Sequence, residues 1–117
     1  MIELVSWGSQ CGNAPVGHAA FDLTVLPPPP PIVANGCGLD EPVQRYYLSD
    51  PVVQQWATTI ACLGLELERN HDSPLMVFIC KEVRHRSVAM AEYVGELLRL
   101  GGSKNTIRHL CLGGDER

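Results

Sequence analysis

The sequence predicts an α/β fold, a small three-layer-type domain in which helices flank a mostly parallel sheet. Short strand-like apolar segments alternate with longer segments in which apolar residues recur at helical spacing. Residues 75–80 (LMVFIC) are continuously apolar, as expected of a strand that is covered on both faces. The strand-helix-strand order at 75–112 implies that its two strands pair with each other in parallel.

The first half of the chain contains two predicted strands. Residues 2–7 (IELVSW) form the first strand, and Gly8 ends it. Residues 19–26 (AAFDLTVL) form the second. The five prolines at 27–31 force an extended segment, which we interpret as a stiff connector in preference to a ligand for another protein.

Two predicted helices follow, and each has a cap signal. Asp40 and Pro42 precede a short helix, while Asp50-Pro51 begins the longest one, at about 51–69. The predicted core stripe of the long helix consists of Val52, Val53, Trp56, Ile60, Leu63 and Leu67.

The second half continues with the strand at 75–80 and a helix at 87–100, which Gly101-Gly102 ends. Residues 106–112 alternate in polarity and predict a last strand, and the remaining tail is expected to fray. The predicted inward residues of the helix at 87–100 are Val88, Ala91, Val94, Leu97 and Leu98.

Length and composition predict one domain, residues 1–117, in the cytoplasm. The chain has 45% hydrophobic and 19% charged residues, and we identify neither a membrane-spanning run nor a secretory signal. The five cysteines include no CxxC pair, so we predict reduced thiols, no metal site and no cofactor. Cys62 and Cys111 are expected to be buried.

The charge is uneven along the chain. Residues 81–108 carry six basic and three acidic residues, a charge of +3, while the rest of the chain carries −7. Two interpretations stay open, namely a positive face for a localised anionic ligand and charges spread over a solvated surface.

The predicted strand ends should meet at one rim, formed by Gly8, residues 25–27 and residues 80–87. Between the strand at 75–80 and the following helix, free backbone N–H groups and the helix dipole favour an anion. Arg86 adds a fork suited to phosphate, and the Ser87 hydroxyl can cap the helix or bind a ligand oxygen. Lys81, Arg84 and His85 raise the local potential.

The spacing of Cys80, five residues, Arg86 and Ser87 is similar to the signature of cysteine-dependent phosphatases. A helix amino terminus and nearby cations lower the pKa of a cysteine thiol, which would make Cys80 a candidate nucleophile. Asp22, Asp40 and Asp115 are the candidates for a general acid. The alternative is that Cys80 is a small buried residue at a strand end.

A longer pattern resembles the family of the C-terminal domain of the RNase adapter protein RapZ. That family has a Gly-Cys-Thr-Gly-Gly-Lys-His-Arg-Ser strand end followed by Ala-Glu, similar to ICKEVRHRSVAMAE here. Its Ser-Phe-Gly is similar to VSWG, and its Phe-Asp-Val-Arg-Phe-Leu-Pro-Asn-Pro to FDLTVLPPP. GCGLDEPV is similar to its Thr-Gly-Leu-Asp-x-Pro-Val segment, and TIRHLCL to its Arg-His-Arg strand.

This resemblance implies a stand-alone domain with a fold like part of a phosphofructokinase. It also implies that the domain senses an amino-sugar phosphate, glucosamine-6-phosphate, and contacts RNA and protein partners. The ligand-facing residues that carry over are Asp22, His85, Arg86 and Ser87. Lys81-Glu82-Val83 replace Thr-Gly-Gly, Pro30 replaces a histidine and Thr24 an arginine. We therefore expect the phosphate-binding end to be retained and the ligand to differ.

We thus predict a regulatory module that binds a phosphosugar or nucleotide and acts through a protein or RNA partner. A cysteine-dependent phosphatase and an RNA-binding module are the alternatives, and homo-oligomerisation stays open. The predicted ligand-binding residues are Asp22, Cys37, Gly38, Cys80, Lys81, Arg84, His85, Arg86 and Ser87.

Overall fold

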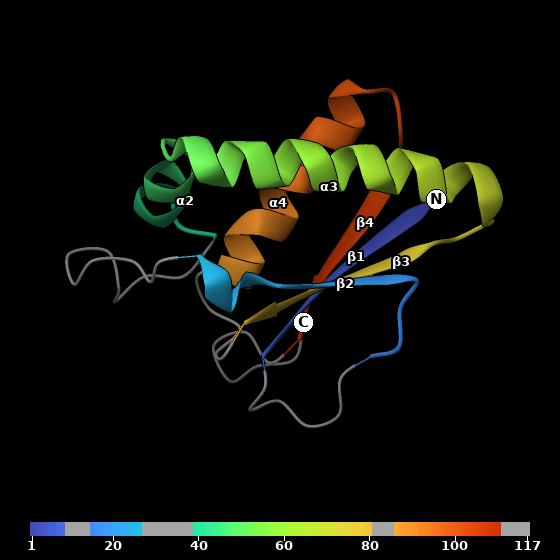
Figure 1. The fold of residues 1–117 in the computed structure, drawn as a ribbon, viewed down its shortest axis with the longest axis horizontal. Coiled ribbons are helices and arrows are strands. Elements are labelled where there is room, and N and C mark those ends of the chain that lie inside the picture. Colours follow the sequence, from blue (N-terminus) through green and yellow to red (C-terminus); the bar gives the residue numbers. More distant parts are fainter. Residues whose placement is uncertain (9–14, 27–38, 81–85, 111–117) are drawn as a thin grey trace.

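The computed structural model describes residues 1–8, 15–26, 39–80 and 86–110 (Figure 1). The described elements, in chain order, are β1 (Ile2–Gly8), β2 (Ala19–Asp22), the 3-10 helix η1 (Leu23–Val25), α2 (Glu41–Leu48), α3 (Pro51–Asn70), β3 (Leu75–Cys80), α4 (Arg86–Leu100) and β4 (Asn105–His109).

The described strands form one parallel sheet in the order β2-β3-β1-β4. Leu4 of β1 lies opposite Met76 of β3 on one side and Ile107 of β4 on the other. The predicted α/β fold with a parallel sheet flanked by helices is therefore confirmed. The predicted pairing of the strands within 75–112 is wrong. β3 and β4 do not pair with each other, because β1 lies between them and pairs in parallel with both.

Helix α4 lies across β1, β3 and β4, and α3 packs beside it. Figure 1 shows α2, α3 and α4 together on one side of the sheet. Successive strand residues point to opposite faces, and Met76, Val77 and Phe78 are all fully buried. The prediction that this strand is covered on both faces is confirmed at its centre.

The second strand is shorter than predicted. It ends at Asp22, and residues 23–25 form η1 instead of continuing the strand. The Asp22 carboxylate accepts hydrogen bonds from the backbone N–H and the hydroxyl of Thr24. A side chain that binds its own backbone two residues ahead favours a turn over a strand.

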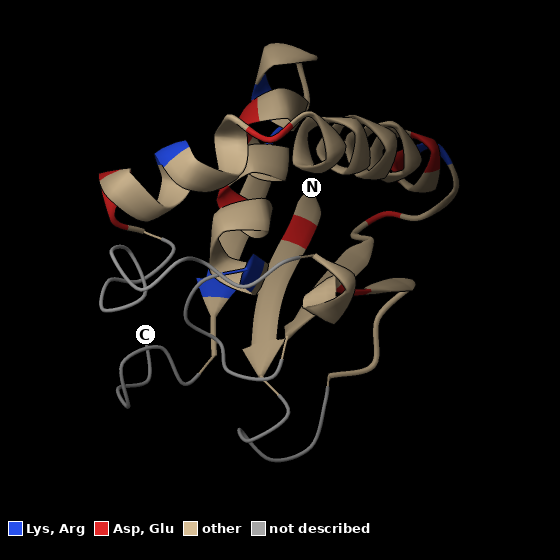
Figure 2. Cartoon of the chain, turned by 60° about the vertical axis from the view of Figure 1, so that its left-hand side comes forward, with Lys and Arg blue, Asp and Glu red and all other residues tan. Residues whose placement is uncertain are grey.

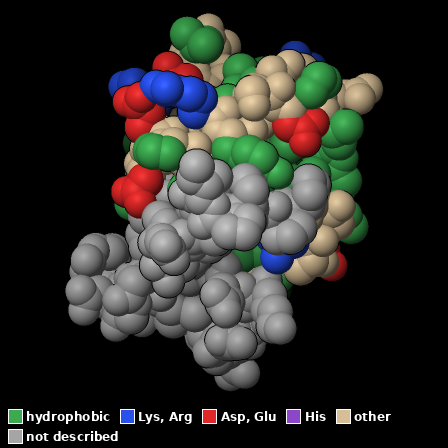
Figure 3. Space-filling model, turned by 90° about the vertical axis from the view of Figure 1, so that its left-hand side faces the viewer, with side chains coloured by type: hydrophobic (Ala, Val, Ile, Leu, Met, Phe, Trp, Pro, Cys, Tyr) green, Lys and Arg blue, Asp and Glu red, His purple; other side chains and the backbone are tan. Residues whose placement is uncertain are grey.

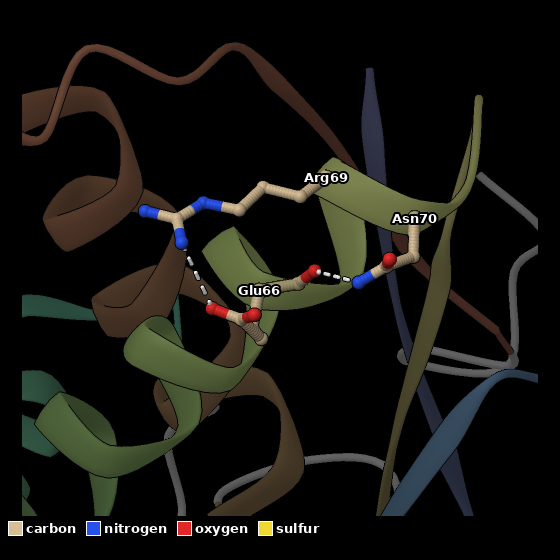
Figure 4. Close-up of polar contacts among 3 residues, drawn as sticks. All are labelled: Glu66, Arg69 and Asn70. Carbon is tan, nitrogen blue, oxygen red and sulfur yellow. Dashed lines mark hydrogen bonds and ion pairs between the residues drawn. The ribbon is translucent and has the colours of Figure 1, made fainter.

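The predicted start of the long helix is confirmed. Asp50 Oδ1 accepts from the Val52 N–H at 2.9 Å, and Pro51 is the first helical residue. Asp40 precedes α2 at the cap position but makes no side-chain capping bond there. The last turn of α3 is held by Asn70, which donates to the Glu66 carbonyl, and by an ion pair between Arg69 and Glu66 (Figure 4).

The predicted core stripe of α3 is partly wrong. Val52 and Leu63 are exposed, and so is Cys62, which the sequence predicted to be buried. The helix buries smaller side chains because it lies close to α4. Its buried residues are Val53, Ala57, Ile60, Ala61 and Gly64. Cys111, the other predicted buried thiol, lies outside the described residues.

Helix α4 agrees with its prediction to within one residue, because it starts at Arg86. Its predicted inward residues are buried except for Leu97, which is half-buried. Gly102 has a φ of 86° and its N–H donates to the Arg99 carbonyl, which confirms the predicted glycine stop. In the described part of the last strand, β4 runs from Asn105 to His109.

Charged residues are dispersed over the described helices (Figure 2). On the face that Figure 3 shows, basic side chains lie beside acidic ones. Arg45 pairs with Glu41, and Arg99 pairs with Glu96. Exposed pairs of this kind contribute about 0.5 kcal/mol or less. Within the described ranges, no helix is both long and apolar enough to cross a membrane.

Candidate site at the carboxyl edge of the sheet

The carboxyl edge of the sheet brings together several predicted rim residues. Gly8 at the end of β1 lies opposite Cys80 at the end of β3. Arg86 opens α4, and its side chain reaches Leu26. This edge therefore combines two strand ends with a helix amino terminus, where the partial positive charge of a helix lies.

Cys80 and Ser87 are in direct contact beneath this edge. Cys80 Sγ lies 3.1 Å from Ser87 Oγ, to which it donates a hydrogen bond. Cys80 exposes 2% of its surface and Ser87 exposes none. The contact joins the end of β3 to the first turn of α4.

Arg86 joins the same turn of α4 to the segment after β2. Its Nη1 donates to the Leu26 carbonyl at 3.0 Å and to the Thr24 carbonyl at 3.4 Å. A guanidinium has five N–H donors in a fixed fork. The two carbonyls that accept from Nη1 fix the plane of the Arg86 guanidinium without a ligand. The other nitrogens of the guanidinium are suited to donating to phosphate oxygens.

Asp22 is an ionised carboxylate beside Arg86. The Thr24 hydroxyl bonds Asp22 Oδ1 at 2.6 Å and the Thr24 N–H bonds it at 2.9 Å. These two bonds, together with the positive charge of Arg86, hold the pKa of Asp22 below its usual value, although burial acts in the opposite direction. Asp22 is therefore suited to accepting hydrogen bonds, and unsuited to the role of general acid near neutral pH.

Tyr47 of α2 is a residue of this site that the sequence analysis did not identify. It exposes 3% of its surface, and it lines a small hollow with Leu26 and Arg86. Burial raises the pKa of Tyr47 well above its usual value, while Arg86 acts in the opposite direction. In the sequence, Tyr47 is one apolar helix residue among several, so no local signal distinguished it.

A second polar cluster that the sequence did not predict lies at the end of β4. Ser6 Oγ lies 2.6 Å from His109 Nδ1, and His109 Nε2 lies 2.8 Å from Glu92 Oε2. Glu92 also borders a hollow of about 280 Å³ between α2 and α4. The hollow is lined by Gln44, Leu48, Ala89, Glu92, Tyr93, Glu96 and Arg99.

Of the predicted site residues, the structure brings Asp22, Cys80, Arg86 and Ser87 to one edge. The other predicted site residues are Cys37, Gly38, Lys81, Arg84 and His85, and they lie outside the described residues. Among the residues that the structure describes, no group of three or more His, Cys, Asp or Glu side chains could hold a metal ion.

The parallel sheet and the polar groups at its carboxyl edge define a small α/β domain of a kind whose strand ends commonly form ligand sites. The sequence matches the family described as the RapZ C-terminal domain over residues 1–113. The chain therefore belongs to that family, as the resemblance in the sequence predicted.

Individual relatives show the same similarity. A "Nucleotide-binding protein" of Aeromonas hydrophila subsp. hydrophila and one of Aeromonas salmonicida are each 38% identical over 96% of this chain. A Shewanella violacea protein, named "Nucleotide-binding protein in ptsN-ptsO intergenic region", is 33% identical over 98% of it. The matched part is 41% of each Aeromonas protein and 43% of the Shewanella protein, so this chain spans less than half the length of these relatives.

Proposed function

We propose that this domain binds a phosphorylated small molecule, a phosphosugar or a nucleotide, at the carboxyl edge of the sheet. The observation that carries the proposal is Arg86 at the amino end of α4, with its fork held by the Leu26 carbonyl. A positive fork and the helix terminus together favour an anion with several oxygens. The names of the relatives agree with a ligand of this kind.

The carboxylate of Asp22 adds selectivity. It lies close enough to Arg86 for the arginine charge to act on its pKa. Inorganic phosphate can donate to this carboxylate only through its own P–OH groups, whereas a phosphosugar or nucleotide also carries sugar hydroxyl groups that can donate to it. The arrangement therefore favours a phosphate ester over inorganic phosphate.

The bound state would act on a protein or RNA partner, so that the domain works as a regulatory module. This part of the proposal rests on the family. An RNA contact would lose affinity steeply as salt rises, because phosphate contacts release counterions. Binding that does not change with salt would favour a protein partner.

The test is thermal unfolding against a panel of inorganic phosphate, phosphosugars and nucleotides. At about 100 times its Kd, a ligand that binds only the folded state contributes about 2.7 kcal/mol, or about 10 °C in Tm. In Arg86→Ala, the ligand should no longer raise Tm above the value that this variant has without ligand. Arg99→Ala is the matched control, because it removes the same charge from the other end of α4, where Arg99 pairs with Glu96. Equal shifts in the two variants would contradict the proposal.

The contact between Cys80 and Ser87 supports a second candidate, a cysteine-dependent phosphatase. The Ser87 hydroxyl, 3.1 Å from Cys80 Sγ, and the amino terminus of α4 are groups of the kind that assist a cysteine nucleophile. Hydrolysis of an aryl phosphate that Cys80→Ser abolishes would support this candidate. Hydrolysis that survives the substitution would reject it.

A further inference from the structure

Ser6, Glu92 and His109 form a chain of hydrogen bonds that joins β1, α4 and β4. His109 lies between the other two, with Nδ1 2.6 Å from Ser6 Oγ and Nε2 2.8 Å from Glu92 Oε2. An ionised carboxylate can only accept, so Nε2 donates to Glu92, and in the neutral imidazole Nδ1 then accepts from the Ser6 hydroxyl. Each ring nitrogen thus has one role, which sets the orientation of the ring.

This chain of hydrogen bonds does not itself contact a ligand. Ser6 is fully buried and His109 exposes 7% of its surface. His109 lies opposite Ser6 in the register of β4 and β1, on the face that α4 covers. Its effect on the edge must therefore pass through α4, which Glu92 belongs to.

Helix α4 is tied to the sheet on two sides. Ser87 contacts Cys80 of β3, and Glu92 contacts His109 of β4. Glu92 follows Ser87 by five positions, which places the two residues about 140° apart around the helix axis. Since β3 and β4 lie on opposite sides of β1, the two contacts together resist a roll of the helix, which one contact alone would permit.

The remaining polar contact between α4 and β4 lies farther from the site. Asn105, the first residue of β4, donates to the Gly95 carbonyl at 3.0 Å. Glu92 is nearer to Arg86 along the helix, by about 4–5 Å of helical rise. Of the two polar contacts with β4, that of Glu92 with His109 is therefore the one nearer to the first turn.

We propose that His109 is a positioning residue for the anion site. It holds Glu92, which sets the rotation of α4, so that Arg86 stays directed at the carboxyl edge and Ser87 stays packed against Cys80. This inference rests on the proposed function at that edge. The His109 bond to Glu92 holds α4 in the position that the site needs, whereas the His109 bond to Ser6 orients the imidazole ring.

Two matched substitutions separate these bonds. In His109→Gln the amide can reach the position of Nε2 and still donate to Glu92. In His109→Asn the shorter amide reaches only the position of Nδ1 and keeps Ser6. Both remove the ring, so both should lower Tm by a similar amount. Affinity for a phosphosugar, glucose-6-phosphate as the probe, should fall about tenfold in His109→Asn and stay within about threefold in His109→Gln.

A measurement without ligand makes the test independent of the proposed function. A rolled first turn would weaken the cover over Cys80, so His109→Asn should speed alkylation of Cys80 by iodoacetamide more than His109→Gln does. The exposed Cys62 serves as the internal reference. Equal Cys80 rates in the two variants would overturn the inference, whatever the binding results.

The binding results also separate the two proposals. If Arg86→Ala abolishes binding and His109→Asn binds like wild type, the positioning role fails and the site stands. If wild type binds no phosphorylated compound, the proposed function fails, and the Cys80 rates alone decide whether His109 positions α4.

Discussion

Replacement of Gly95 by alanine should destabilise the protein, because α4 approaches β4 closely at this residue. An added methyl group would lie 2.7 Å from Ile107 Cδ1 and 3.0 Å from Asn105 Oδ1. Carbon atoms in favourable contact lie about 3.5–4.0 Å apart, so the helix or its neighbours must move. Overpacking of this kind costs about 1–3 kcal/mol.

Gly64 of α3 provides a matched control. Both glycines lie inside helices, so alanine gains about 1 kcal/mol of helix propensity at each. At Gly64 the added methyl would lie 3.1 Å from Met76 Sδ, and methionine is an adaptable side chain. We expect Gly64→Ala to be nearly neutral and Gly95→Ala to be about 1–2 kcal/mol less stable than Gly64→Ala.

Urea unfolding followed by circular dichroism measures this difference. The two variants should have equal m-values, so that their midpoints report stability alone. A difference of about 1 kcal/mol corresponds to about 4 °C in Tm for a domain of this size. If Gly95→Ala were as stable as Gly64→Ala, α4 would not approach β4 as closely as the structure shows.

Three further predictions concern single side chains. Asp50→Ala should cost about 1 kcal/mol in chemical unfolding, because Asp50 accepts from the Val52 N–H, while Asp50→Asn should retain most of the stability. Folding lowers the pKa of Asp22 from 3.8. The Asp22 carboxylate therefore contributes to stability above pH 3.8, and this contribution is lost as the pH falls through the lower pKa of the folded state. A carbon NMR titration of the folded protein that gave a pKa of 3.8 or more would refute this. Iodoacetamide should modify exposed Cys62 rapidly and buried Cys80 slowly in the native protein, and peptide mapping that found equal rates would contradict the burial of Cys80.

Elements with strong local signals were predictable from the sequence. The cap at Asp50, the glycine stop at Gly102 and the apolar strand β3 each follow from residues that are neighbours in the chain. The convergence of Gly8, Cys80 and Arg86 was also predictable, because the carboxyl ends of parallel strands meet at one edge.

Features that depend on packing between distant segments were not predictable. Local periodicity favoured large residues such as Leu63 for the core of α3, but the close approach of α3 to its neighbours buries Ala57 and Gly64 instead. The bond between Ser6 and His109 joins residues 103 positions apart. Nothing in the sequence around Ser6 distinguishes it from any other small strand residue, so only the register of β1 and β4 reveals this contact.

The central place of β1 has a consequence for folding kinetics. Its partner strands begin at Leu75 and Asn105, so every backbone bond between β1 and its neighbours closes a long loop. Pairings between such distant segments form slowly, because the chain loses entropy before the contacts form. During synthesis, β1 cannot pair until the ribosome has made β3 and β4, which lie in the later part of the chain. During that time an apolar strand with two open edges would be exposed, and such a strand is prone to aggregate until its partners form.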